Sequence, residues 1–568
     1  MITLSIPPVI RDSSPAWVAV FVLFLLPPLI LTLPLLPLTI YNLHFHPLAS
    51  YPGPLSHRAS TLPYITHTLL GTTVQHHARL HARYGPVVRI APNQLSYISV
   101  AAWRDIYAVR EGREGSPGRG CLGVKGYQGA KGKRGDNTVC AKEMIKEELV
   151  FPGDDFEFFA PAKPMISCDA ANHGRHRRAV ASAFSERAVR SYEGVILEKT
   201  ALLMRRLDDE QGRVDLSGSR RGGSGGINIM DWFHFVMFDI TSALVFGKSF
   251  GNLERGGYHE WVARVFPGMK LVAWSLAVAE VPGLGRLISW FLPRKMVSEA
   301  RRHVQSIIDM TDARNRAQLT NPPHQVDFMS YILPPLEGEK GTTAYLSEEE
   351  LYLNAQLLCI AGSETTASLL AGAVYFLSLR ENARHRDRLI TELRGQFASV
   401  EDITPTNLAL RAPFLGAVLN ECLRLYPPGA INMPRTVPAG GAMIDGNYVA
   451  GGSVVGIAQF AAYRSATHWI DPLTFAPERW LEGSQGRYAG DRKDVFKPFS
   501  FGPRNCVGQS LAVAECRLIV ARLFWEFDVH VLAGQEDWVR QKTFLSWEKP
   551  PLMVNVRRRL SVDPCEPV

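Results

Sequence analysis

The stretch Phe499-Ser500-Phe501-Gly502-Pro503-Arg504-Asn505-Cys506-Val507-Gly508 is the most informative part of this 568-residue sequence. A cysteine thiolate can ligate iron and push electron density into it when nearby donors stabilise its charge. Gly502 and Gly508 let the backbone approach a flat cofactor closely, and Phe499 can shield the sulfur. Arg504 can pair with an anionic edge of such a cofactor. An isolated cysteine is usually a buried inert thiol, but this combination of residue types predicts a metal-binding thiolate at Cys506.

The sequence continues as a helical pattern from Gln509 to Trp525, which directs the positive N-terminal end of a helix toward Cys506. No two of the eight cysteines form a CxxC motif, and their spacing suits neither a zinc module nor a dense disulfide framework. We therefore expect the other cysteines to be mostly small buried hydrophobic residues in a reducing compartment.

Two charged motifs precede the cysteine stretch. Glu421 and Arg424 stand three positions apart on a helical pattern, which places them on one face of the helix. Arg479 belongs to Pro477-Glu478-Arg479-Trp480, about twenty positions before the cysteine stretch. Alone, a Glu–Arg pair at this spacing is usually a surface salt bridge worth under about 1 kcal/mol. Its meaning therefore depends on the other motifs in the chain.

A long helical pattern covers residues 347–379 and contains Ala361-Gly362-Ser363-Glu364-Thr365-Thr366. At about 1.5 Å per residue this helix would be roughly 50 Å long, enough to cross a whole domain. Gly362 costs about 1 kcal/mol relative to alanine in the middle of a helix. The hydroxyl of Thr365 can bond back to the carbonyl of Ala361 and loosen the turn. Taken alone, a helix kink with a surface glutamate explains the segment equally well.

Together these segments resemble the cytochrome P450 family. The cysteine stretch is similar to the haem-binding loop FxxGxRxCxG of that family, in which Phe499 and Gly502 occupy fixed positions. The resemblance implies that Cys506 is the axial thiolate ligand of the iron in haem b.

The other motifs have counterparts in the same family. Glu421, Arg424 and Arg479 match its ExxR and PER elements, which implies a buried charge network with a structural role in holding the haem pocket. Glu364 and Thr365 match its oxygen-activation motif, which implies that they deliver protons during dioxygen activation.

The haem propionates require cationic or hydrogen-bonding partners. The resemblance implies Arg504, Arg435 and Arg177, together with His173, which lies four positions before Arg177 on the same helical face. The family usually has tryptophan where His173 stands, so this match is weaker, although histidine can still donate a hydrogen bond. A solvated surface position is the alternative for any single arginine.

Shorter matches extend the similarity over most of residues 41–555 and indicate a fungal microsomal member of secondary metabolism. They are His46-Pro47-Leu48 with Tyr51-Pro52-Gly53-Pro54, Arg89-Ile90-Ala91-Pro92-Asn93, Trp103-Arg104-Asp105-Ile106-Tyr107 and Trp547-Glu548-Lys549-Pro550-Pro551-Leu552.

Residues 16–40 contain no charged side chain and are long enough to span a bilayer. Their four prolines argue for kinks or a shallower, interfacial position. A cleaved signal peptide is the alternative, but the run is too long and no small-residue cleavage site follows closely. We expect a tail over 1–15, a transmembrane anchor over 16–40, a proline-rich hinge over 41–55 and a haem-thiolate catalytic domain over 56–568. The resemblance places that domain on the cytoplasmic side of the endoplasmic reticulum membrane, held by a single span.

Two glycine-rich segments, 111–140 and 217–226, interrupt the catalytic domain and depart from the family pattern. In 111–140, glycine falls at nearly every third position, but collagen would also need proline and three chains. A natural surface loop is one interpretation of 111–140, and translation of a retained intron is another, which we favour.

The remaining patterns predict a mainly α fold with a minor β part, as in the cytochrome P450 fold. Ser347 and Glu350 predict a capping box at the start of the long helix. Short strands are predicted near 87–100, over 442–456 and at the C-terminus. Further helices are expected over 74–84, 101–109, 169–206, 228–247, 295–318, 382–398 and 408–425.

Composition excludes several classes of protein. Apolar residues make up 46% of the chain and charged residues 20%, which is unlike a disordered chain. The net charge of +8 is spread over scattered Lys and Arg, so nucleic acid binding is not expected. Membrane lipid or an acidic partner suits this charge equally well.

The resemblance implies a monooxygenase, an oxidoreductase acting on paired donors, that inserts one atom of dioxygen into an apolar small molecule by hydroxylation or epoxidation. Its electrons would come from NADPH through a separate cytochrome P450 reductase, with cytochrome b5 as an optional second donor, because the chain shows no dinucleotide-binding pattern. Arg492, Lys493 and Lys497 are candidates for contact with an acidic reductase, and solvated side chains are the alternative. Other functions remain open: a haem-thiolate isomerase or dehydratase without electron input, which Glu364 and Thr365 argue against, and a non-catalytic haem sensor.

Overall fold

The computed structural model of the chain describes residues 35–108, 110–111, 141–142, 145–146, 162–217, 226–281, 283–285, 293–320, 326–333, 346–483 and 486–559. The predicted tail, most of the predicted anchor, and residues 112–140 and 218–225 of the glycine-rich segments lie outside these residues.

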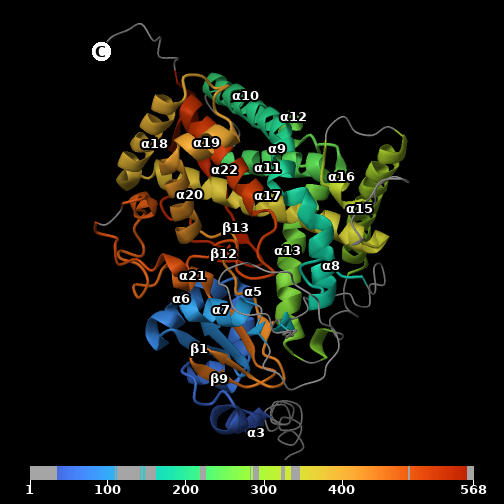
Figure 1. Ribbon diagram of the computed structural model, residues 1–568, viewed down its shortest axis with the longest axis vertical. Coiled ribbons are helices and arrows are strands. Elements are labelled where there is room, and N and C mark those ends of the chain that lie inside the picture. Colours follow the sequence, from blue (N-terminus) through green and yellow to red (C-terminus); the bar gives the residue numbers. More distant parts are fainter. Residues whose placement is uncertain are drawn as a thin grey trace, which may run out of the picture.

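Helix α17 (Glu348–Ser378) crosses the helical part of the molecule (Figure 1). It packs most extensively on α11 (Ile229–Phe246) and also contacts α20 (Pro413–Leu425) and α22 (Gln509–Glu526). The predicted capping box is confirmed, because Ser347 Oγ accepts from the Glu350 amide at 3.3 Å and the Glu350 carboxylate accepts from the Ser347 amide at 2.9 Å.

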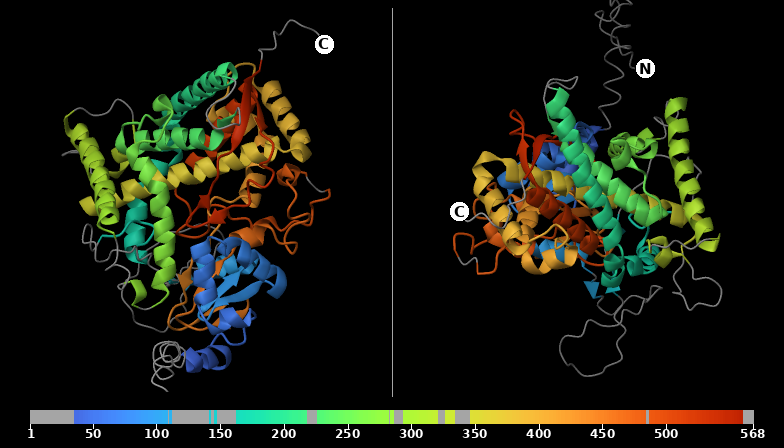
Figure 2. Two further views of the ribbon diagram at one scale, coloured as in Figure 1. Left: turned by 180° about the vertical axis from the view of Figure 1, so that it is seen from behind. Right: turned by 90° about the horizontal axis from the view of Figure 1, so that it is seen from above.

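The other helices surround this core, and Figure 2 shows the long α10, α13 and α15 in two further orientations. They are α3 (Leu35–Ile40), α4 (Leu55–Ala59), α5 (Leu62–Leu70), α6 (Thr73–Tyr84), α7 (Val100–Tyr107), α8 (Ala170–Ala181), α9 (Glu186–Ser191), α10 (Glu193–Ser217), α12 (Asn252–Arg255), α13 (Glu260–Ala279), α15 (Arg294–Thr320), α16 (Met329–Ile332), α18 (Ala383–Gln396), α19 (Pro405–Arg411) and α21 (Gln459–Tyr463). Short turns of other helix types are η3 (Tyr41–Phe45), η4 (Ser182–Phe184), η5 (Arg380–Asn382), η6 (Pro477–Trp480) and η7 (Lys493–Val495).

The minor β part is divided, and its largest sheet lies at the end of the molecule that also holds α3 (Figure 1). Its largest sheet has the order β1 (Val87–Ala91), β2 (Gln94–Tyr97), β10 (Val454–Ile457), β7 (Arg435–Thr436), β5 (Ile145–Lys146). A second sheet has the order β11 (Phe527–Val531), β14 (Met553–Arg558), β6 (Ile227–Asn228). The remaining strands form the pairs β3 (Arg110–Glu111) with β4 (Ala141–Lys142), β8 (Ala442–Ile444) with β9 (Asn447–Val449), and β12 (Lys542–Thr543) with β13 (Trp547–Glu548).

Two predicted helices are each divided in the structure. The pattern over 169–206 becomes α8, η4, α9 and α10, because Ser185 adopts an extended backbone and its hydroxyl caps α9 by accepting from the Ala188 amide. The pattern over 408–425 becomes α19 and α20, because Pro413 has no amide hydrogen to continue the first helix and starts the second.

Within the described residues, α11, α13 and α17 are long and apolar enough to cross a membrane. Most of the apolar stretch of α11 and of α17 is buried within the fold, so tertiary packing explains why these two helices are apolar. In α13, only 22% of the apolar stretch is buried. Of the predicted anchor, residues 35–40 are described and form α3, which runs directly into η3.

Candidate active site

The loop before α22 is shaped around Cys506. The Cys506 amide donates to the carbonyl of Phe499 at 2.9 Å, which closes the loop on itself. Gly502 has φ +79°, and a Cβ at this position would lie 1.9 Å from the carbonyl oxygen of Tyr107. Only glycine fits there, because both the backbone conformation and the approach of Tyr107 exclude a side chain. α22 then begins at Gln509, as the sequence predicted, so its N-terminal end follows directly on the cysteine.

Cys506 differs from the other cysteines in the described part of the chain. Its side chain is exposed, whereas Cys168, Cys359, Cys422 and Cys516 are buried. Surrounding protein raises the pKa of the Cys506 thiol, and the backbone amide of Gly508 and the charge of Arg177 oppose that rise. Cys506 is therefore the described cysteine that is placed to ligate the metal of a bound group.

Arg177 connects α8 to the cysteine loop. Its Nη1 donates to the Asn505 carbonyl at 2.6 Å and its Nη2 donates to the Asn505 side-chain oxygen at 2.9 Å. Burial lowers the pKa of Arg177, and the nearby Cys506 opposes this by raising it. His173 lies one turn earlier on α8 and is buried. The structure thus brings Arg177 to the loop that carries Cys506.

Arg435 and Arg504 reach the same region from other elements. Arg504, within the loop, donates from Nη2 to the Cys168 carbonyl at 3.1 Å. Arg435 on β7 is buried, and its guanidinium carbon lies 4.9 Å from the centre of the Tyr107 ring. Because the carbonyl of Tyr107 also abuts Gly502, this residue links β7 to the cysteine loop.

Glu364 and Thr365 have different surroundings on α17. Thr365 is exposed, and its hydroxyl donates to the Ala361 carbonyl at 2.7 Å, as the sequence predicted. Glu364 is 3% exposed, so the alternative of a surface glutamate is wrong. Its carboxylate accepts from Lys549 and from Ser546, and it contacts His234. The acid is therefore embedded in a buried polar cluster beside the threonine.

Gly362 has a packing reason that its sequence context did not reveal. A Cβ at this position would lie 2.9 Å from Cγ2 of Thr241 on α11. The hydroxyl of Thr241 also bonds Ser363 on α17, at 2.5 Å. Glycine at this site therefore allows the two central helices to approach closely.

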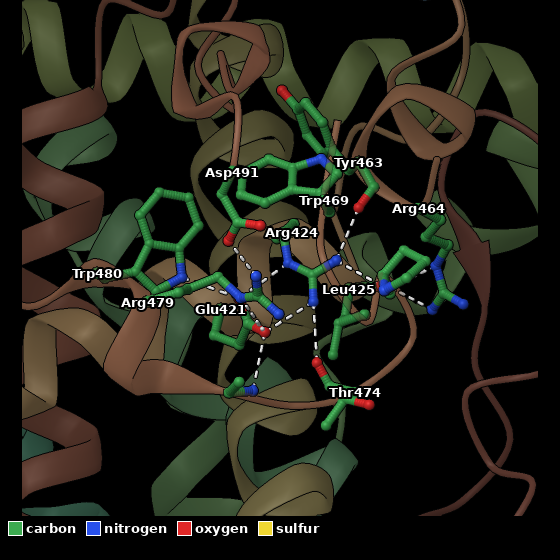
Figure 3. A network of polar contacts seen from close by, with 12 residues as sticks. Glu421, Arg424, Leu425, Tyr463, Arg464, Trp469, Thr474, Arg479, Trp480 and Asp491 are labelled. Carbon is green, nitrogen blue, oxygen red and sulfur yellow. Dashed lines mark hydrogen bonds and ion pairs between the residues drawn. The ribbon is translucent and has the colours of Figure 1, made fainter. Parts of the chain in front are cut away.

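The charge network implied by Glu421, Arg424 and Arg479 is fully formed (Figure 3). Glu421 accepts from Arg424 at 2.7 and 2.9 Å and from Arg479 at 3.1 Å, and the three side chains are 0% exposed. Arg424 also donates to the carbonyls of Tyr463, Pro472 and Thr474. Every charge here has partners, so removal of one partner would leave another charge buried and uncompensated.

Several members of these clusters were not predicted from the sequence. Asp491 pairs with Arg479, and Trp480 donates to Glu421 at 2.9 Å (Figure 3). His234 and Lys549 hold Glu364. Lys549 and Trp480 lie inside segments that matched the family pattern, which was an available signal, whereas Asp491 and His234 carry no recognisable spacing.

A family model described as cytochrome P450 matches residues 139–556. The chain belongs to the cytochrome P450 family. The monooxygenase astJ of Aspergillus oryzae is 36% identical over 92% of this chain and 94% of its own length. The monooxygenases traB of Penicillium crustosum and lcsI of Purpureocillium lilacinum are 35% and 33% identical, over 92% and 91% of this chain and 94% and 91% of their own lengths.

These comparisons confirm the predicted cytochrome P450 fold and the enzyme class, a cytochrome P450 monooxygenase. Family membership carries with it a haem-thiolate iron and electrons from NADPH through a reductase. The residues present fit such a group, because an accessible thiol sits at a helix N-terminus in a loop where Gly502 removes side-chain bulk. Guanidinium groups of Arg177, Arg435 and Arg504 supply positive charge around that loop.

Proposed function

We propose that this cytochrome P450 is a membrane-anchored enzyme that inserts one atom of dioxygen into an apolar small molecule, by hydroxylation or epoxidation. We further propose that it performs a tailoring step in fungal secondary metabolism. The observation that carries the proposal is the accessible thiol of Cys506 in a loop shaped by Gly502 and tied to α8 by Arg177.

In this proposal, Cys506 ligates the haem iron, and haem supplies the activation of dioxygen when bound. Phe499 shields the sulfur, and its carbonyl fixes the Cys506 amide. The haem propionates are bound by positively charged and hydrogen-bonding side chains, which suit the anionic edge of the group. These side chains are Arg177, Arg435, Arg504 and His173.

Glu364 and Thr365 handle protons in this proposal. Thr365 is exposed, and its hydroxyl donates a hydrogen bond to the Ala361 carbonyl. This hydroxyl can pass a proton onward. Glu364, one residue earlier and buried, supplies that proton from the polar cluster around it.

Electron supply requires a partner, because the chain shows no dinucleotide-binding pattern. We propose NADPH–cytochrome P450 reductase, with cytochrome b5 as an optional second donor. Arg492, Lys493 and Lys497 lie just before the cysteine loop and would meet acidic side chains of the reductase.

The membrane attachment is proposed from the apolar run 16–40, followed by a hinge over 41–55 and the catalytic domain over 56–568. Apolar side chains are exposed in the last residues of the run, with Leu36 62% and Leu38 53% exposed, and beyond it, with Phe45 72% exposed. A lipid surface would cover such side chains. We place the enzyme in the endoplasmic reticulum membrane, with the catalytic domain in the cytoplasm.

The carbon-monoxide difference spectrum of the reduced protein tests the proposal. We expect the red-shifted Soret band of a thiolate-ligated haem in the wild type and its loss in Cys506→Ser. Cys359→Ser is the matched control, because it makes the same change at a buried cysteine within α17, where a serine hydroxyl can donate to the carbonyl four residues earlier in the helix. A wild-type band typical of imidazole ligation, or retention of the band in Cys506→Ser, would overturn the assignment.

A further inference from the structure

A continuous chain of hydrogen bonds ends at the buried carboxylate of Glu364. Its Oε2 lies 3.0 Å from Nε2 of His234 on α11. Nδ1 of the same imidazole lies 3.0 Å from the hydroxyl of Tyr258, which precedes α13. That hydroxyl lies 2.7 Å from Oδ1 of Asp231, in the first turn of α11. The four side chains therefore connect α17 to the beginning of α11 through unbroken polar contacts.

Burial changes along this chain. Asp231 and Tyr258 are half-buried, whereas His234 is 5% and Glu364 is 3% exposed. Phe266 packs on the His234 ring with centroids 4.7 Å apart, so apolar contacts line the inner part of the path. The row of hydrogen bonds thus begins near solvent, at Asp231, and ends at Glu364, beside Thr365.

The donors and acceptors of the chain allow two proton arrangements. The ionised Glu364 carboxylate only accepts, so Nε2 of His234 carries a hydrogen in both. In one arrangement Tyr258 donates to an ionised Asp231 and accepts from Nδ1–H, which makes His234 an imidazolium. In the other, a protonated Asp231 donates to Tyr258, and Tyr258 donates to a neutral His234. The two arrangements differ only in the transfer of one proton from Asp231 through Tyr258 to His234.

The other neighbours of Glu364 hold it as an anion. Burial opposes ionisation, but the charge of Lys549 and the hydrogen bond and charge of His234 lower the pKa of Glu364 to about 2. Ser546 donates to Oε1 at 2.7 Å. Burial and the nearby carboxylates raise the pKa of Tyr258, so this phenol stays protonated and passes protons by exchange. An acid held so firmly as a carboxylate needs a proton brought to it before it can act as a donor.

We propose that Asp231, Tyr258 and His234 form a proton relay that loads Glu364 from solvent. The proposal rests on the function proposed above for Glu364 and Thr365. A proton taken up by Asp231 passes to the Tyr258 oxygen while the phenolic proton moves to Nδ1 of His234. The Nε2 proton then moves to Glu364 Oε2, which leaves Asp231 ionised and His234 neutral. Exchange with water, in which His234 loses its Nδ1 proton and gains one at Nε2, resets the relay.

Tyr258→Phe tests the relay, because it removes the hydroxyl that joins Asp231 to His234 and leaves the contact between His234 and Glu364. Tyr426→Phe is the matched control. Tyr426 is buried close enough to Glu364 for that charge to raise its pKa further, but its hydroxyl donates to Gln541 at 2.7 Å. The two variants make the same chemical change near the same carboxylate, inside and outside the relay.

The first readout is infrared difference spectroscopy of the holoenzyme without turnover. The imidazole bands of His234, assigned by difference against His234→Gln, are expected to shift in Tyr258→Phe and to stay unchanged in Tyr426→Phe. The carboxylate band of Glu364, assigned against Glu364→Gln, should persist in both variants. Unchanged imidazole bands in Tyr258→Phe would overturn the proton arrangement on which the relay depends.

The second readout is peroxide released per NADPH oxidised, measured with the reductase and without added substrate. We expect a severalfold increase in Tyr258→Phe, approaching the level of Thr365→Ala, and no change in Tyr426→Phe. Equal peroxide yields in Tyr258→Phe and wild type would overturn the relay even if Thr365→Ala leaks peroxide. A Thr365→Ala variant that leaks no more than wild type would instead contradict the proposed role of Thr365.

Discussion

Arg177 donates to the backbone carbonyl and to the side-chain oxygen of Asn505, the residue before Cys506, at 2.6 and 2.9 Å. A single guanidinium on α8 therefore fixes both the path and the side chain of the cysteine loop. A planar fork with parallel donors suits this contact, and an ammonium group cannot reproduce it.

Arg177→Ala is expected to reduce the haem retained per protein during gel filtration several-fold, because the loop loses its tie to α8 and a nearby positive charge. Arg177→Lys should recover only part of this loss, since the charge returns without the paired contact. Arg178→Ala, at the exposed neighbouring position, is the control. Full retention in Arg177→Lys would show that charge alone, and not the contact with Asn505, is what matters.

Asp491 extends the buried charge network beyond its predicted members. Its side chain pairs with Arg479, and both are 0% exposed. Asp491→Ala should lower the free energy of unfolding by about 3 kcal/mol, because it leaves part of a buried guanidinium charge uncompensated. Denaturant unfolding of the detergent-solubilised protein measures this. Asp494→Ala, where the side chain is 57% exposed, is expected to change stability by less than about 0.5 kcal/mol, and equal effects of the two variants would contradict the prediction.

The sequence predicted the parts of the site that depend on local spacing. Cys506, Gly502 and the helix after them are neighbours in the chain, and Glu421 with Arg424 lies within one turn of a helix. Such residues are brought together by a loop or by helical periodicity, which a sequence displays directly.

The remaining parts depend on contacts between distant elements. Glu364 meets His234 and Lys549, which lie 130 and 185 positions away, and no periodicity relates them. The reason for Gly362 is likewise a methyl group on α11, visible only when the two helices are packed. These contacts come from tertiary packing. The sequence therefore showed that Glu364 and Gly362 were unusual, but it could not show which residues they contact.

Glu350 joins the start of α17 to α8 and makes stability depend on pH. Its carboxylate contacts Arg175 at 2.5 and 2.7 Å and His176 at 3.1 Å. The pKa of Glu350 is lowered to about 2, and the hydrogen bonds from Arg175 are the largest cause. A carboxyl with a depressed pKa in the folded state contributes stability above its unfolded pKa, and this contribution is lost as the pH falls toward the folded value.

Glu350→Gln should therefore be less stable than wild type by roughly 1–2 kcal/mol at pH 7, after allowance for solvent screening. The difference should shrink as the pH falls from about 5 toward 2. Glutamine keeps the capping box with Ser347, so the variant removes the charge and one acceptor of Arg175 but leaves the helix cap. Unfolding free energies measured across this pH range, beside Glu348→Gln as control, check the prediction, and a difference independent of pH would contradict it.

Deletion of residues 112–135 is expected to leave the carbon-monoxide-binding haem content per protein unchanged. The segment lies outside the described residues, and the family match begins at residue 139, next to its end. If the segment is translated from a retained intron, sequencing of the mature transcript across codons 111–140 should show a shorter message. A sharp fall in holoprotein yield on deletion would show instead that the segment belongs to the enzyme.

Gly362→Ala tests the close approach of α11 and α17. Alanine is favoured over glycine in a helix by about 1 kcal/mol, but its Cβ would lie 2.9 Å from Cγ2 of Thr241. Because overpacking of a core typically costs about 1–3 kcal/mol, we expect net destabilisation in the wild-type background. Thr241→Ser removes that methyl group and keeps the hydroxyl that donates to the Met237 carbonyl at 2.8 Å.

In the Thr241→Ser background, Gly362→Ala is therefore expected to become neutral or stabilising. A double-mutant cycle of unfolding free energies gives the coupling between the two positions, which should be at least about 1 kcal/mol. If Gly362→Ala has the same effect in both backgrounds, the contact with Thr241 is not what requires glycine. The mid-helix glycine would then have to be explained by the loosened turn at Thr365.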